Sequence, residues 1–496
     1  MKRFLKRNAI SPALLILNLA LSITYFICIV AFFPIGNEFL FSLLVIGEIF
    51  HLWQVIGYIH VVWPKTRVRA FNESYKPEVG IFITACGEPR EVIEETVQAA
   101  LAIDYQRFSV YILNDGYVAN RSNWKEAEQI AKAYGVTCIT RQQPGGAKAG
   151  NINNALRVTK EPFVVIFDAD HVPKPIFLRE MMGYFIDKKV AYVQSPQYYK
   201  NHDENMVTGG AWDQQALFFG AIMLGKDDTN TAFMCGTNMV LRRSALIEAG
   251  GMSEQSIAED FLTSLLIHEN GGKSVYVGKV LAEGLAPEDF LSYYKQQFRW
   301  ARGSLEVVFK YNPIFRKGLT FSQRLQYLAS ASFYMTGVVV VINALLPLVF
   351  LYTGLEPIAI STMNLALIFI PYIIVVLYTL QLTSNFSFTF RALSFSLSSF
   401  PIHLKAIGQI LIGRKSGFVV TSKKKLSGNY AYLVMPHLVY IALVCIGITV
   451  GLFREGFSAS VITNISWSFI YVAIFMPFIN AAFEKEKNVA GQEVAA

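Results

Sequence analysis

Two aspartates, Asp168 and Asp170, directly follow the apolar run FVVIF in the segment FVVIFDADH. Carboxylate oxygens are the ligands that hard divalent cations prefer, and such a cation completes its shell with phosphate oxygens and water. The alternative is a turn with two solvated aspartates, because the Asp-X-Asp pattern also occurs by chance. The position at the end of an apolar strand favours a metal-binding pair.

Two further polar clusters could bind the remainder of a nucleotide. In LNDG, Asp115 follows an apolar run and could hydrogen-bond a ribose or a base, although these residues are also a turn signal. In KAGNINNAL, Lys148 follows the flexible QPGGA and precedes an expected helix. A cation beside the N–H groups of a helix start suits a diphosphate, whereas the alternative is a plain loop and cap.

Glu259 and Asp260 open an amphipathic helix in SIAEDFLTSLLI. Acidic side chains stabilise a helix N-terminus through the helix dipole, so both could be purely structural. The functional interpretation makes Asp260 a general base that takes a proton from an attacking hydroxyl group. The sequence of this helix alone does not separate the two interpretations.

The pentapeptide QQFRW precedes the C-terminal apolar runs. Its Arg299 can hold a phosphate bidentately, and Gln296 lies nearby on the same helical face. The ring of Trp300 is a flat surface on which a sugar can stack. The alternative is an Arg–Trp anchor at a membrane surface.

The elements that must position these residues lie in the polar middle of the chain, residues 77–310. Apolar runs alternate there with helical periodicity, in the order VGIFITA, EVIEETVQAALAI, FSVYILND, KEAEQIAKAYG, VTCIT, NINNALRVT and FVVIFDAD. This alternation predicts a βαβ sheet of buried parallel strands. Ligands gather at the carboxyl ends of such strands, where TACGEP, NDG and DADH lie.

Both ends of the chain carry apolar runs of the roughly 20 residues that cross a membrane. Of the 496 residues, 53% are hydrophobic and only 16% are charged, below the ~25% of a soluble protein. The first run is long and lacks a small-residue cleavage site, so we expect an anchor and not a signal peptide. The six expected spans are residues 12–34, 39–63, 327–352, 358–382, 431–453 and 461–483.

Lysine and arginine set the expected orientation. MKRFLKR precedes the first span and KKK lies between the fourth and fifth, so the positive-inside bias places both termini and residues 64–324 on the cytosolic side of the plasma membrane. This bias and contact with anionic membrane lipids account for the net charge of +8, and we expect no nucleic-acid partner. The five scattered cysteines predict neither a disulfide framework nor a zinc site.

ITACGEP, LNDG, KAGN, DADH, FMCGTNMVLRR, AED and QQFRW follow one another in this order. In these motifs and their order, the chain resembles the processive family 2 glycosyltransferases, and most of all the cellulose synthase catalytic subunit. FMCGTNMVLRR resembles the acceptor-side FFCGT segment of that family, and FVVTSK at 418–423 matches its FxVTxK gating-loop pattern. The resemblance covers residues 15–480.

The resemblance implies a membrane protein in which a cytosolic α/β GT-A (Rossmann-like) domain is inserted between two and four transmembrane helices, with amphipathic interfacial helices. The expected parts are two transmembrane helices, the GT-A domain, helices three and four, an interfacial helix with the gating loop, helices five and six, and a polar tail. Their ranges are 1–64, 65–324, 325–383, 384–429, 430–484 and 485–496.

The resemblance also implies roles for individual residues. The nucleotide sugar would be bound by Thr84, Glu88, Asp115, Lys148, Asp168, Asp170, Gln296 and Arg299. Mg²⁺ or Mn²⁺ would be held by Asp168 and Asp170, with His171 as an extra ligand, and Asp260 would be the catalytic base. The acceptor would contact Trp300, Cys235, Gly236 and Glu259. A lid over the loaded nucleotide would be formed by Phe418, Val420, Thr421 and Lys423.

Three features depart from the family pattern. The chain has NDG where DDG is common, so Asn114 replaces a carboxylate and Asp115 must serve alone. It has AED where TED is usual, which keeps Asp260. The stretch after residue 483 is too short for the cyclic-di-GMP-binding PilZ domain of many bacterial cellulose synthases, so we expect none.

The expected activity is inverting, processive transfer of glucose from UDP-glucose to a β-1,4-linked glucan that crosses the membrane through the protein's own channel. Glu48, His51 and Asn343 are candidate channel residues, although hydrogen bonding between helices explains them slightly better. The alternatives are another β-glucan such as a mixed β-1,3/1,4 polymer, a UDP-N-acetylglucosamine or hyaluronan-like synthase, a lipid-linked sugar transferase, and a nucleotide-sensing transporter. Accessory export subunits are not identifiable from the sequence.

Overall fold

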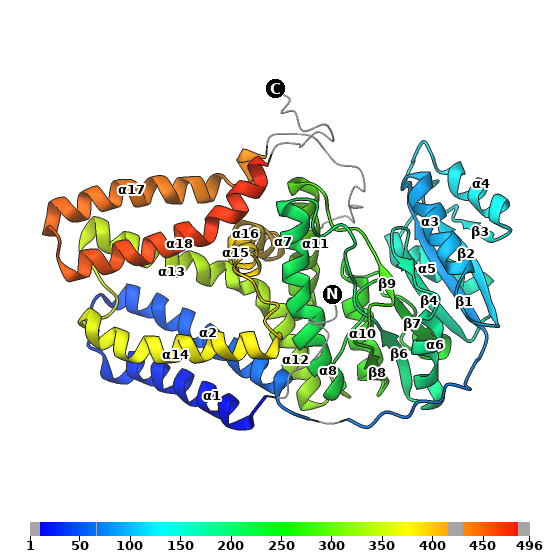
Figure 1. Ribbon diagram of the computed structural model, residues 1–496, viewed down its shortest axis with the longest axis horizontal. Helices are drawn as coiled ribbons and strands as arrows, with labels where there is room; N and C mark the ends of the chain where they lie inside the picture. Colours follow the sequence, from blue (N-terminus) through cyan, green and yellow to red (C-terminus); the bar gives the residue numbers. More distant parts are fainter. Residues whose placement is uncertain (1–9, 66, 415–429, 485–496) are drawn as a thin grey trace.

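The computed structural model describes residues 10–65, 67–414 and 430–484. Long helices form a bundle at one end of the molecule, and an α/β domain lies at the other (Figure 1). Shorter helices, including α7 and α11, lie between these two parts (Figure 1). The expected gating-loop residues, Phe418, Val420, Thr421 and Lys423, lie outside the described residues.

A seven-stranded mixed sheet forms the centre of the α/β domain, in the order β3-β2-β1-β4-β7-β6-β8. The strands β1 to β4 are parallel, as the sequence predicts, but β7 runs antiparallel to both its neighbours. Because of this direction, β7 starts near the carboxyl end of β4. The strands are β1 Val79–Ala85, β2 Phe108–Asn114, β3 Thr137–Thr140, β4 Phe163–Asp168, β6 Val190–Gln194, β7 Met239–Arg242 and β8 Lys273–Tyr276.

Helices cover both faces of this sheet. Alternate residues of β1 point to opposite sides, so that Ile81 and Ile83 pack in one core cluster and Phe82 packs in another. The helices that contribute to the first cluster are α3 Arg90–Leu101, α4 Lys125–Tyr134 and α6 Phe177–Met182. Those that contribute to the second are α5 Ala147–Val158, α9 Arg243–Glu248 and α10 Glu259–Glu269. Burial on both faces explains why these strands are continuous apolar runs.

Six helical segments of the described chain are long and apolar enough to cross a membrane. They coincide with the six expected runs, and all of them except the start of the third lie in the bundle of Figure 1. The segments are Pro12–Phe32, containing α1 Pro12–Ile27; α2 Glu38–Val62; Phe321–Thr353, containing α12 Phe321–Ser332 and α13 Thr336–Thr353; α14 Thr362–Thr383; α17 Met435–Glu455; and α18 Ala459–Phe483.

Among the helices between the two parts, α11 packs against the bundle. Phe290 and Tyr293 of α11 pack in one cluster with Phe395 and Phe478, and Ala301 packs with residues of α16. Asp289 caps α11 through a 2.8 Å hydrogen bond from the Ser292 amide. The helices of this layer are α7 Met206–Leu217, α8 Met223–Asp228, α11 Phe290–Glu306, α15 Phe390–Ser398 and α16 Phe400–Leu411.

Candidate active site

A cavity of about 180 Å³, the first cavity, opens at the carboxyl ends of β1, β2 and β4. Every predicted site residue that the structure describes lines it, although these residues are far apart in the sequence. They are Thr84, Glu88, Asp115, Lys148, Asp168, Asp170, His171, Cys235, Gly236, Glu259, Asp260, Gln296, Arg299 and Trp300.

Lys148 and Asp168, which both line the first cavity, form an ion pair. Lys148 also donates to the Gly236 carbonyl oxygen at 2.8 Å, and Thr84 donates to Asp168 Oδ1 at 3.2 Å. The helix α5 begins at Ala147, earlier than the sequence predicts, so Lys148 lies inside its first turn. Burial alone would lower the pKa of Lys148, but Asp168 and nearby carboxylates raise it above its ordinary value. The amine is therefore charged.

The side chains of Asp168, Asp170 and His171 fit a divalent cation. One ligand atom from each lies within 4.8 Å of the other two. Asp170 and His171 are buried, and neither ring nitrogen of His171 has a hydrogen-bond partner in the described part of the chain. Buried polar atoms without partners are costly unless a ligand satisfies them. The donor set of two carboxylates and an imidazole suits Mg²⁺ or Mn²⁺.

The two residues of NDG have different structural roles. Asp115 lines the first cavity and accepts hydrogen bonds from Arg141 at 2.7 and 2.9 Å. Burial raises the pKa of Asp115, and Arg141 opposes that effect. Asn114 instead accepts from the Gly116 amide at 2.9 Å and donates to the Trp124 carbonyl oxygen at 2.9 Å, so it holds the turn. The sequence did not predict the contact of Arg141 with Asp115, because Arg141 belongs to no motif.

The acidic pair of AED lies at the start of α10, as predicted, and lines the first cavity. Burial and then the charge of Glu259 raise the pKa of Asp260 to about 7. Gly236 separates Asp260 from Lys148, because a Cβ atom at Gly236 would lie 3.3 Å from Asp260 Oδ2 and 3.7 Å from Lys148 Nζ. Gly236 has a φ of +81°, which favours glycine. A carboxylate of raised pKa in a cavity suits general-base chemistry.

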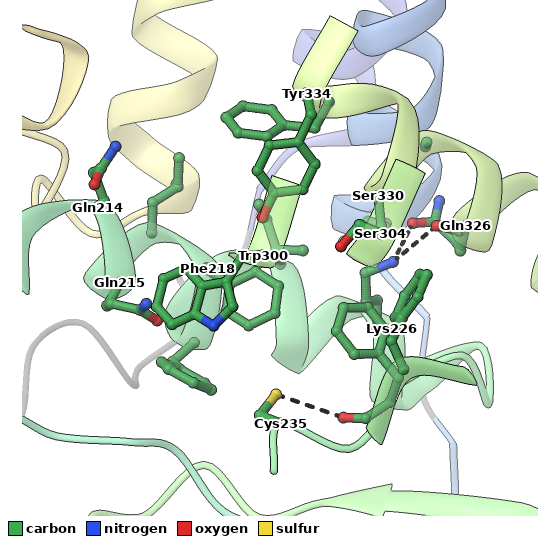
Figure 2. Close-up of a pocket in the computed structure, with 18 of the residues that line it drawn as sticks. Gln214, Gln215, Phe218, Lys226, Cys235, Trp300, Ser304, Gln326, Ser330 and Tyr334 are labelled. Atoms are coloured by element: carbon green, nitrogen blue, oxygen red, sulfur yellow. Dashed lines mark hydrogen bonds between the residues drawn. The ribbon is translucent and has the colours of Figure 1, made fainter. Parts of the chain in front are cut away.

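A second cavity, of about 310 Å³, adjoins the first. The residues that line both are Gln197, Cys235, Ala258, Asp260 and Trp300. Figure 2 shows residues that line this second cavity, among them Trp300 and Phe218.

Several neutral hydrogen-bonding groups lie among the mainly apolar side chains that line the second cavity. They include Gln214, Gln215, Ser304, Ser330 and Tyr334. Because these residues come from helices that only the tertiary structure brings together, no local motif identifies them. Amides, hydroxyls and aromatic rings suit the hydroxyl groups and C–H faces of a sugar, whereas the first cavity suits a metal-bound diphosphate.

The expected channel residues lie within the helical bundle. Glu48 in α2 is buried, and its Oε2 lies 3.4 Å from His51 Nδ1. A Cβ atom at Gly47 would lie 3.3 Å from Asn343 Oδ1 of α13. Asn343 therefore lies at the contact between α2 and α13.

Two family models match this chain. Glycosyltransferase like family 2 matches residues 77–303, and cellulose synthase matches residues 247–480. Residues 77–303 are therefore similar to the family 2 glycosyltransferases, and residues 247–480 are similar to cellulose synthase. The match to cellulose synthase and the six apolar helices indicate an integral membrane protein.

Two named relatives are similar to this chain over most of its length. A protein named putative cellulose synthase 2, from Komagataeibacter xylinus, is 30% identical over 467 residues, which are 90% of this chain and 30% of that protein. The cellulose synthase catalytic subunit [UDP-forming] of Pseudomonas fluorescens (strain SBW25) is 28% identical over 474 residues, which are 91% of this chain and 63% of that protein. The chain thus spans less than two thirds of the length of either relative.

A solved structure supports the fold. The mannosyltransferase PcManGT from Pyrobaculum calidifontis, in complex with GDP-Man and Mn²⁺, superposes with a TM-score of 0.53 at 17% sequence identity. The match covers 76% of this chain and all of that one. It places the α/β domain in the GT-A fold.

Proposed function

We propose that this protein polymerises glucose from UDP-glucose into a cellulose-like β-1,4-glucan and passes the polymer through its own transmembrane helices. The observation that carries the proposal is the meeting of the two cavities at Asp260 and Trp300. A diphosphate site and a sugar site that share a buried carboxylate have the arrangement that a sugar transfer needs.

The donor would occupy the first cavity. Asp168 and Asp170, with His171 beside them, would hold Mg²⁺ or Mn²⁺, which neutralises negative charge on the diphosphate when bound. The charged amine of Lys148 and the guanidinium of Arg299 line the same cavity and would bind the diphosphate oxygens. UDP as the nucleotide is supported by the name of the UDP-forming relative.

The acceptor would enter from the second cavity, with its terminal sugar on Trp300. Asp260 accepts the proton of the acceptor hydroxyl group, whose oxygen bonds to the anomeric carbon. The bond between that carbon and the diphosphate oxygen breaks, and its electron pair leaves with UDP. A single displacement of this kind inverts the anomeric centre, so an α-linked donor gives a β-linkage. Lys148 and Arg299 stabilise the charge that develops on the leaving diphosphate.

The membrane arrangement is also part of the proposal. Lysines and arginines at the N-terminus and in residues 423–425 support a cytosolic catalytic domain and cytosolic termini in the plasma membrane. The FVVTSK segment, outside the described residues, matches the gating-loop pattern of the cellulose synthases. Its match to the cellulose synthase pattern supports glucose over N-acetylglucosamine.

The test uses purified protein in lipid nanodiscs, with radiolabelled UDP-glucose or UDP-N-acetylglucosamine. We expect UDP release and a long product from UDP-glucose only, after Mg²⁺ or Mn²⁺ is added, and loss of both with EDTA. Cellulase should degrade the product; degradation by lichenase would indicate a mixed-linkage glucan. Absence of UDP release from every sugar nucleotide would refute the proposal and favour a nucleotide-sensing transporter.

A further inference from the structure

Gln197 follows β6 and lies at the boundary between the two cavities. Among the described side chains that line both cavities, only those of Gln197 and Asp260 carry an oxygen that can accept a hydrogen bond. The others belong to Cys235, Ala258 and Trp300, and an indole ring only donates. The proposed mechanism uses Asp260 as the base and gives Gln197 no role.

The protein fixes the orientation of the Gln197 amide. Its Nε2 donates to the Cys235 carbonyl oxygen at 2.6 Å. Because a carbonyl oxygen can bond only to the nitrogen end of the amide, the oxygen Oε1 is turned away from Cys235. Gln197 is half-buried, and within the described chain Oε1 accepts no hydrogen bond and is not sealed from the surface. A hydrogen-bond acceptor is therefore available to a ligand at this boundary.

The loop that carries Cys235 has a second support. The buried Gln194 accepts a hydrogen bond from the Cys235 amide at 2.9 Å and donates to the Thr237 carbonyl oxygen at 2.8 Å. The loop is thus held without Gln197. A purely structural role does not explain why Gln197 turns its amide oxygen toward the cavities.

One peptide unit separates the contacts of Gln197 and Asp260. The Cys235 carbonyl oxygen contacts Gln197, and a Cβ atom at the next residue, Gly236, would lie 3.3 Å from Asp260 Oδ2. The amide oxygen and the carboxylate therefore flank the Cys235–Gly236 peptide, and both residues line both cavities. Two acceptors placed in this way suit two hydroxyl groups on neighbouring carbons of one sugar ring.

The base identifies the first of these hydroxyl groups. In the proposed β-1,4-glucan, the 4-hydroxyl of the terminal glucose attacks, and we place that glucose on Trp300. Its neighbours are the 3-hydroxyl, which the ring holds rigidly beside it, and the 6-hydroxyl, which is attached to a rotatable arm. A fixed amide and a fixed ring hydroxyl lose less conformational freedom when they bind, which favours the 3-hydroxyl.

We propose that Gln197 Oε1 accepts a hydrogen bond from the 3-hydroxyl of the acceptor's terminal glucose and so directs the 4-hydroxyl to Asp260. A 3-hydroxyl bonded to a neutral amide does not give its proton to the carboxylate, so the 4-hydroxyl alone attacks. The inference rests on the proposed function and deepens it, because it names the residue that selects a β-1,4 over a β-1,3 linkage.

The test compares three acceptors with the full-length protein in nanodiscs. One is cellotetraose, and the other two lack either the 3-hydroxyl or the 6-hydroxyl of the glucose at the non-reducing end. A fluorescent group at the reducing end lets consumption of each acceptor report the first transfer from UDP-glucose. We expect a wild-type kcat/KM about tenfold lower for the 3-deoxy acceptor than for cellotetraose, in line with the loss of one hydrogen bond. Gln197→Met should lose about tenfold with cellotetraose and nothing further with the 3-deoxy acceptor.

A second variant separates the sugar contact from the contact with Cys235. In Gln197→Glu the carboxylate keeps an acceptor oxygen but cannot donate to the Cys235 carbonyl oxygen. This variant should keep the preference for cellotetraose over the 3-deoxy acceptor. The matched control is Gln98→Met, whose exposed side chain on α3 donates to the Tyr134 hydroxyl; it should also keep this preference.

Three results would overturn the inference. The first is equal use of cellotetraose and the 3-deoxy acceptor by the wild-type protein. The second is an undiminished 3-deoxy penalty in Gln197→Met, because a purely structural glutamine would affect every acceptor equally. The third is a penalty that depends on Gln197 but appears only with the 6-deoxy acceptor. Calorimetry with UDP checks that each variant is folded, and the wild-type comparison decides even if a variant is not.

Binding without donor separates this inference from the proposed function. Quenching of tryptophan fluorescence should show weaker binding of the 3-deoxy acceptor than of cellotetraose by the wild-type protein, and equal binding of the two by Gln197→Met. If no sugar nucleotide yields UDP, the proposed function fails, and this binding difference alone decides the role of Gln197.

Discussion

The two cavities that meet at Asp260 differ in charge. The first gathers carboxylates and cations, among them Asp168, Asp170, Lys148 and Arg299. The second is larger and is lined almost wholly by neutral side chains. Strong electrostatics suit the step in which a diphosphate leaves, because charge develops there. Neutral contacts suit a polymer that must be held and then advanced by one residue. If this division is correct, substitutions in the two cavities should separate donor effects from acceptor effects.

The largest expected effect is at Asp260, which belongs to both cavities. Asp260→Asn removes the base but keeps the shape of the side chain, so transfer should fall by about 10²–10⁴-fold. Binding of UDP-glucose, measured by calorimetry, should persist. Glu269→Gln at the other end of the same helix is the control and should transfer normally. Substantial turnover by Asp260→Asn would remove Asp260 as the base.

The next effect isolates the acceptor side. Trp300→Ala removes the aromatic surface, and the loss of an aromatic anchor of about 2 kcal/mol corresponds to a roughly 30-fold lower kcat/KM for the acceptor. Polymer yield should collapse while UDP affinity is retained, and Trp300→Phe should recover part of the yield. A normal polymer from Trp300→Ala would mean that the acceptor sugar rests elsewhere.

The pH dependence of transfer should reveal how the cavities share Asp260. Burial and then Glu259 raise the pKa of Asp260 to about 7, while Lys148 and Arg299 oppose that shift. Because the base must be ionised, kcat/KM should fall by about tenfold per pH unit below 7 and level off above it. Glu259→Gln removes the neighbouring charge and should move this inflection to lower pH. A rate that stays constant from pH 8 to pH 5 would contradict the shifted pKa.

The sequence predicted the first cavity better than the second. The first cavity is built at strand ends, and the strands were identifiable because burial on both faces makes them apolar runs such as VGIFITA and FVVIF. Parallel strands end at one edge, so Thr84, Asp115 and Asp168 had to come together. The apolar runs and the rule that ligands gather at the carboxyl ends of parallel strands were sufficient to predict this site.

The remaining features depend on contacts that no local pattern encodes. The reversed direction of β7 follows from the path of the chain through α7 and α8. The early start of α5 uses Gly146, whose φ of +63° precedes the helix. Arg141 and Lys226 hydrogen-bond to residues that are distant in sequence, Asp115 and Gln326 respectively. Residues of this kind become visible only when the helices are assembled.

The smallest expected effect tests whether the neutral wall of the second cavity acts on the acceptor alone. Gln215 in α7 is buried and lines this cavity but not the first. Losing one hydrogen bond of about 0.5–1.5 kcal/mol corresponds to a two- to tenfold weaker interaction. Gln215→Ala should therefore raise the acceptor KM by about threefold and leave the UDP-glucose KM unchanged, as measured by UDP release at varied acceptor concentration. An equal rise in both constants would mean that the two cavities respond as one site, because a shift of α7 would then reach the donor through Asp260 and Trp300.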